Sequence, residues 1–118
     1  MKMSTLTEQN IAFIADAFNL SQVLTRAGEE FSEATTAVIQ YRRAAVDGEG
    51  DLQERRFALV DELADMYVMA EQVMHKTPGL RLEVTDRIRA KVQRTIKRYD
   101  LCDIGAGRVT RKHLKDED

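Results

Sequence analysis

The sequence predicts an all-α fold, an antiparallel four-helix bundle. One Pro and six Gly in 118 residues leave long stretches without helix breakers, and the chain is rich in residues with high helix propensity. Apolar residues recur with a period near 3.6, and the segments that carry them are joined by short connections. The length suits one domain. We expect a helical domain over residues 1–104 and a charged tail over residues 105–118.

The first two helices are expected over about residues 6–18 and 21–44. Thr5 followed by Glu8 predicts a capping box at the start of the first helix. Ser21 is the predicted N-cap of the second helix, because its hydroxyl can accept a hydrogen bond from the first turn. The apolar stripe of the second helix consists of Val23, Leu24, Ala27, Phe31, Ala34, Val38 and Ile39.

Two further helices are expected over about residues 52–75 and 80–100, after a loop rich in Gly and acidic residues at 47–50. Asp51 with Glu54 predicts a second capping box. The third helix is apolar on more than one side, which predicts burial by several neighbours. The fourth is basic on most faces, and its inward-facing residues are predicted to be Val84, Ile88, Val92, Ile96 and Tyr99.

Two acidic pairs interrupt the apolar runs of the second and third helices. Glu30 and Glu33 are three residues apart, as are Glu62 and Asp65, so each pair shares one helix face. Burying like charges is costly unless a positive charge is present. We expect the four carboxylates to form a cage for a hard divalent cation such as Mg²⁺. The competing interpretation is that the acids are solvated and paired with basic residues, as Arg26 could pair with Glu29 or Glu30.

The acidic pairs belong to a pattern, Glu-Glu-Phe-Ser-Glu at 29–33 followed after 28 residues by Glu-Leu-Ala-Asp at 62–65. Over roughly residues 20–98 the chain resembles the MazG-like branch of the all-α nucleoside triphosphate pyrophosphohydrolases. The resemblance implies a homodimer or homotetramer that uses Mg²⁺, with Mn²⁺ as a substitute. It also implies hydrolysis of an NTP or dNTP to the monophosphate and pyrophosphate, a hydrolase activity in nucleotide metabolism.

The resemblance also assigns roles to residues by their positions. The implied metal ligands are Glu30, Glu33, Glu62 and Asp65. Glu29 would orient water, and Glu29 or Glu33 could take its proton. The implied phosphate-binding residues, on the basic fourth helix, are Lys91, Arg94 and Arg98. Gln22 is the candidate for base or sugar contact, although it lies one residue further upstream than the usual Gln of the family.

A second hypothesis is a non-catalytic helical interaction protein that binds a partner or nucleic acid through the basic fourth helix, although that surface could also be only a solvated face. Nucleic acid is not favoured, because the net charge is −2. No apolar run approaches the length of a membrane span, so we expect no membrane association and a cytoplasmic location. Cys102 is the only cysteine, which excludes an intramolecular disulfide.

Overall fold

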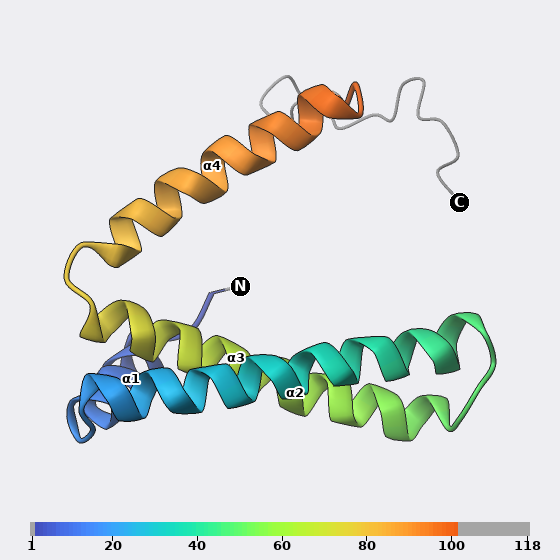
Figure 1. Ribbon diagram of the computed structural model, residues 1–118, viewed down its shortest axis with the longest axis horizontal. Coiled ribbons are helices and arrows are strands. Elements are labelled where there is room, and N and C mark those ends of the chain that lie inside the picture. The colour runs from blue at the N-terminus through green and yellow to red at the C-terminus, as the bar shows by residue number, and fades with distance from the viewer. Residues whose placement is uncertain (1, 102–118) are drawn as a thin grey trace. The chain divides into compact units, whose positions relative to one another are not determined.

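The computed structural model describes residues 2–101, which form four α-helices and no β-strand (Figure 1). The helices are α1 (Thr5–Asp16), α2 (Leu20–Val46), α3 (Leu52–Lys76) and α4 (Leu80–Arg98). The all-α prediction with four helices is therefore confirmed. The predicted tail at 105–118 lies outside the described residues. None of the described helices combines the length and apolarity that crossing a bilayer requires.

The chain divides into two compact units, residues 1–78 with α1 to α3, and a second unit that begins at Gly79 and contains α4. Each unit is described by itself, and the packing of α4 onto the other helices stays a prediction. The candidate site is built from residues of the first unit.

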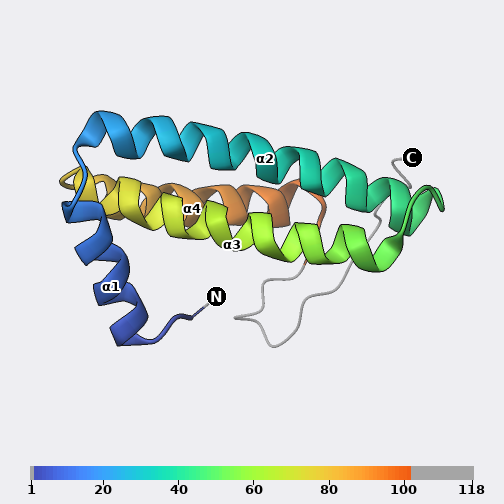
Figure 2. The ribbon, with the colours of Figure 1, turned by 90° about the horizontal axis from the view of Figure 1, so that it is seen from below.

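Helices α2 and α3 form an antiparallel hairpin in which they lie side by side over most of their length (Figures 1 and 2). The buried residues of α2, together with the half-buried Glu30 and Tyr41, follow alternating spacings of four and three, which is the pattern of a seam between two helices. The buried residues are Val23, Ala27, Ala34, Ala37 and Ala44. Four of the five are alanines, so the helices can approach closely along this seam. At one end of the hairpin Val23 and Ala27 pack with Met69.

Helix α1 packs against the C-terminal part of α3 (Figure 2). Its buried residues are Ile11 and Ala15, which are four positions apart and share one face. A hydrogen bond of 2.8 Å joins the Asp16 carboxylate to Nε2 of His75 at the end of α3. This contact ties the end of α1 to the end of α3.

The N-caps of the first two helices differ from the predicted ones. Ser4, not Thr5, caps α1 and accepts a hydrogen bond from the Thr7 amide. For α2, Asn19 replaces the predicted Ser21 and forms a capping box with Gln22. An N-cap needs extended backbone, which Ser4 (ψ 153°) and Asn19 (ψ 167°) provide. Thr5 and Ser21 already lie inside their helices.

Asp51 is confirmed as the N-cap of α3, because its side chain accepts a hydrogen bond from the Glu54 amide at 3.1 Å, which is one half of the predicted capping box. The loop before it bends through Gly48 and Gly50, whose φ angles of +70° and +98° favour glycine. The Glu49 amide donates to the Arg43 carbonyl at 2.9 Å, which holds the loop against the end of α2.

Much of the apolar surface of α3 is uncovered in the first unit. Met69 and Gln72 are its buried residues, whereas Phe57 is 75% exposed, Val60 61% and Tyr67 43%. The expectation that several neighbours bury this helix is therefore met at its C-terminal half but not along its whole length. On α4, the residues predicted to face inward include Ile88 and Val92, which are exposed, and no residue of that helix is buried.

Candidate metal centre

The carboxylates of Glu30 and Glu62 lie in the seam between α2 and α3, because both residues continue the spacing of the buried residues on their helices. Glu30 lies three residues after buried Ala27 and four before buried Ala34, so it occupies a seam position of α2. Glu62 lies seven residues before buried Met69 and therefore shares its side of α3. Both glutamates are half-buried. The helical spacing thus directs two acids into an apolar interface.

Three carboxylates meet at this place. One oxygen each of Glu30, Glu62 and Asp65 can be chosen so that all three atoms lie within 4.8 Å of one another. Oε2 of Glu30 and Oε2 of Glu62 are buried and have no hydrogen-bond partner in the described part of the chain. Buried acceptors are normally hydrogen-bonded, so two unpartnered carboxylate oxygens in one place call for an explanation.

The electrostatics of Glu30 show the same crowding. Burial is the main cause that raises the pKa of Glu30 above its usual value, and the negative charges of Glu33 and Asp65 raise it further. The positive charge of Arg26, one helical turn earlier, acts in the opposite direction but does not cancel the effect. The attraction of Arg26 therefore leaves this acid without full compensation.

Glu62 lies in a similar field. Burial first, and then the charge of Glu33 and its hydrogen bonding, raise the pKa of Glu62, with smaller effects from Asp65 and Glu30. Glu33 is exposed, yet it acts on both seam glutamates and so lies beside them. The structure thus gathers all four acids singled out from the sequence, three at ligand spacing and Glu33 at their edge.

This arrangement favours either a shared proton or a cation. The donor set consists of carboxylate oxygens, which are the ligands of hard cations such as Mg²⁺, Mn²⁺ and Ca²⁺. A cation among the three would supply the partner that the buried oxygens of Glu30 and Glu62 lack. The residues present therefore fit a hard divalent metal ion.

The other candidate residues have different surroundings. Glu29 is exposed on α2. The side-chain oxygen of Gln22 accepts a hydrogen bond from the Asn19 amide at 3.0 Å, so this glutamine helps to cap α2. The candidate phosphate-binding residues are all exposed on α4, in the second unit: Lys91, Arg94 and Arg98.

Sequence reasoning missed a pocket of about 280 Å³ at the start of α2. The guanidinium of Arg26 lies over the ring of Phe18, 5.4 Å from its centre. The pocket is lined by Phe18, Ser21, Gln22, Thr25 and Arg26. All five residues lie within residues 18–26 at the spacing of one helix face, but the predicted break between residues 18 and 21 separated Phe18 from the others, so the pocket was not anticipated.

Comparison of the chain with known protein families, curated proteins and solved structures found no match.

Proposed function

We propose that the protein is a Mg²⁺-dependent nucleoside triphosphate pyrophosphohydrolase of the MazG-like type, which converts an NTP or dNTP to the monophosphate and pyrophosphate. The observation that carries the proposal is the group of three carboxylates from Glu30, Glu62 and Asp65, with two buried oxygens that lack a partner. Such a group is costly on its own and suits a hard cation of the kind that phosphate chemistry uses.

In this proposal Glu30, Glu62 and Asp65 hold the metal, and Mn²⁺ can take the place of Mg²⁺. When bound, the metal offsets phosphate charge and makes water a better nucleophile. Glu33 lies beside Glu30 and Glu62 but outside the group of three, so its carboxylate is available to take a proton from the attacking water. Glu29 lies one turn before Glu33 and can orient that water or replace Glu33 in this role.

Substrate contacts are proposed for residues of α2 and, separately, for residues of α4. Arg26 lies four residues before Glu30, about 6 Å along the helix axis, and its pocket includes the flat ring of Phe18. A base could stack on the guanidinium that covers that ring, with Gln22 at the edge of the same pocket. Three cations of α4 supply charge for the phosphates: Lys91, Arg94 and Arg98.

The proposed assembly is a homodimer or homotetramer. Leu24, Phe31 and Val38 recur every seven residues on α2, and all three side chains are exposed. Together with Phe57 and Val60 of α3 they leave more apolar surface than an isolated hairpin should present to water. A second copy of the chain would cover these side chains.

The proposal is tested with Glu62→Gln and its matched control Asp61→Asn. Asp61 is the neighbouring acid, is exposed, and lies outside the group of three. Pyrophosphate release is measured over a panel of NTPs and dNTPs with Mg²⁺ present or chelated, and Mg²⁺ binding is measured by calorimetry. We expect Glu62→Gln to lose at least about 100-fold in activity, because losing a ligand should exceed the effect of losing an outer-shell partner.

Asp61→Asn should keep both Mg²⁺ binding and hydrolysis, and circular dichroism should find the same helix content in both variants. Full activity of Glu62→Gln would refute the metal centre. If the unaltered chain neither binds Mg²⁺ nor releases pyrophosphate from any nucleotide, the protein is better explained as a helical interaction protein.

A further inference from the structure

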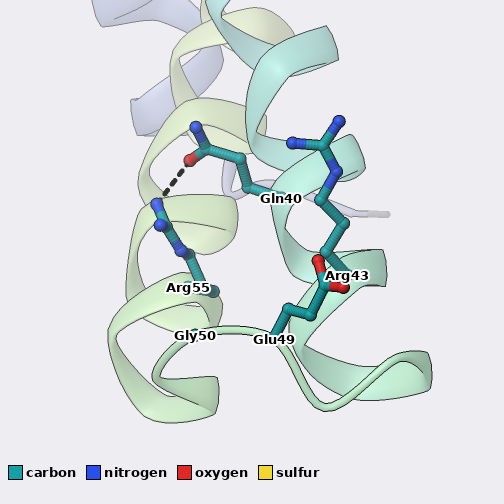
Figure 3. Close-up of a pocket in the computed structure, with 5 residues that line it drawn as sticks. All are labelled: Gln40, Arg43, Glu49, Gly50 and Arg55. Atoms are coloured by element: carbon teal, nitrogen blue, oxygen red, sulfur yellow. Dashed lines mark hydrogen bonds between the residues drawn. The ribbon is translucent and has the colours of Figure 1, made fainter.

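Another pocket, with a polar lining, lies at the loop end of the α2–α3 hairpin (Figure 3). Its volume is about 260 Å³, which is just below the range of typical small-molecule sites and suits a small group more than a whole nucleotide. It is lined by Gln40 and Arg43 of α2, Glu49 and Gly50 of the loop, and Arg55 of α3.

Arg55 is held in place on one side of this pocket. Its Nη1 donates to Oε1 of Gln40 at 2.6 Å, across the two helices. The backbone of Gly50 lies against the same guanidinium, since a Cβ built on this glycine would be 3.5 Å from Nε of Arg55. An Arg carries five N–H donors, and only the one to Gln40 has an acceptor in the described part of the chain. The remaining donors are therefore positioned but not used.

Arg43 lies on the other side of the pocket, on α2 (Figure 3). Among the described residues its guanidinium has no ion-pair partner, in contrast to the neighbouring Arg42, which pairs with Asp47 at 3.2 Å. Glu49 reduces the positive charge of the pocket, so two guanidinium groups and one carboxylate leave a net charge of +1. An anion would satisfy this charge and the free donors together.

We propose that this pocket binds a phosphate group, either as free phosphate or pyrophosphate or as part of a small phosphate ester. A phosphate has enough oxygens to accept hydrogen bonds from two arginine side chains on opposite sides, whereas the two oxygens of a carboxylate are used by one bidentate arginine. The pocket is separate from the metal centre, because Gln40 lies ten residues after Glu30, about 15 Å further along α2.

The test uses the full chain in the presence of a chelator, so that no metal can recruit phosphate to the acidic group. Inorganic phosphate, pyrophosphate and adenosine monophosphate are titrated in turn, at constant ionic strength, while amide NMR signals are followed. We expect saturable shifts of the Glu49 and Gly50 amides with at least one of the three probes. Which probe binds best separates free phosphate from a phosphate ester.

Three variants then examine the charges of the pocket. Arg43→Gln should weaken binding about tenfold or more, as the loss of a charge-assisted contact does. Arg42→Gln is the matched control, because it removes the same charge one residue away, from an arginine that is already paired with Asp47. This variant should change the affinity for phosphate less than twofold. Glu49→Gln should bind phosphate more tightly.

The proposal is overturned if none of the three probes gives saturable shifts. It is also overturned if Arg42→Gln and Arg43→Gln lose affinity equally, since the attraction would then be a general effect of charge. Neither result depends on whether the acidic group binds a metal or hydrolyses a nucleotide.

Discussion

Glu30 and Glu62 stand where the neighbouring turns of their helices carry alanine and methionine. A carboxylate in such a position loses part of its hydration and gains like-charged neighbours, and both effects raise the pKa of these two residues. In the folded, metal-free protein the ionised forms are therefore less favourable than in the unfolded chain. The acidic group should reduce stability unless a proton or a cation joins it.

This reasoning predicts how stability depends on pH. Because the pKa values of Glu30 and Glu62 are raised on folding, the folded state binds more protons than the unfolded state above the ordinary value of about 4.5. Without divalent cations, the free energy of unfolding should fall as the pH rises from about 4.5 through the raised pKa values. Urea unfolding with a chelator present measures this slope, and Glu62→Gln should make it shallower.

Added Mg²⁺ should recover the lost stability near neutral pH, because an ion that binds only the folded state stabilises it. A metal-free protein whose stability rises over the same pH window would contradict the electrostatics assigned to the two glutamates.

The sequence was sufficient to find these acids but not to assign each its place. Spacings of three residues and apolar flanks predicted that Glu30 and Glu62 would approach each other across a helix interface, and they do. The position of Glu33 at the edge was not predictable from spacing. Its side chain lies off the seam, and its distance from the other three depends on how closely the alanines let the helices pack.

At the scale of single elements, the start of α2 offers a direct comparison of two candidate caps. Asn19→Ala removes the side chain that accepts from the Gln22 amide at 2.8 Å, and it should destabilise the protein by about 1 kcal/mol. Ser21→Ala, at the position expected from the sequence, should cost almost nothing, because Ser21 lies inside the helix. Chemical denaturation of both variants measures the difference, and a larger loss for Ser21→Ala would contradict the observed cap.

Two glycines should respond to alanine in opposite directions. Gly28 lies within α2, and nothing lies within 4 Å of an added Cβ, so Gly28→Ala should stabilise the helix by about 0.5–1 kcal/mol. Gly48 has a φ of +70°, so Gly48→Ala should destabilise the hairpin by about 1 kcal/mol or more. Thermal unfolding of both variants at low protein concentration tests the pair. If both substitutions changed the stability in the same direction, the backbone conformation assigned to one of the two glycines would be wrong.

The extents of the helices were largely predictable, whereas their first residues were not. Periodicity and the Gly-rich loop located all four helices to within a few residues of their observed bounds. The observed N-caps of α1 and α2 differ from the predicted ones because Ser4 and Thr5, like Asn19 and Ser21, have similar capping ability and lie close together in the sequence. Backbone conformation, which the sequence does not state, selects between them.

At the scale of the whole molecule, the exposed apolar residues predict self-association. Light scattering after size exclusion should give two or four times the 13.4 kDa of the chain. Val60→Lys should reduce the measured mass, because a buried charge opposes docking of a second copy. Leu6→Lys is the control, since Leu6 is an equally exposed residue on α1, outside the proposed interface. A monomeric unaltered chain at high concentration would refute the proposed assembly.

Properties that depend on the pairing of distant residues were beyond the sequence. The phosphate pocket exists because Gln40 and Arg55 face each other across the hairpin, and neither residue belongs to a recognisable motif. The sequence indicated that α3 is apolar on more than one side, but not which of its side chains stay uncovered in the first unit. An apolar residue gives the same sequence pattern whether its neighbour comes from the same chain or from another.

The alternating spacing of the α2 seam has a consequence for how this chain can change. Lengthening the loop at residues 47–51 would leave Glu30 and Glu62 facing each other, since the alanines would still set how the two helices dock. A single residue inserted between Glu30 and Ala34 would instead rotate the first half of α2 by about 100° against the second. Either the carboxylate or the alanines would then leave the interface. The acidic group should therefore tolerate changes in the length of the loop but not in the length of the helix.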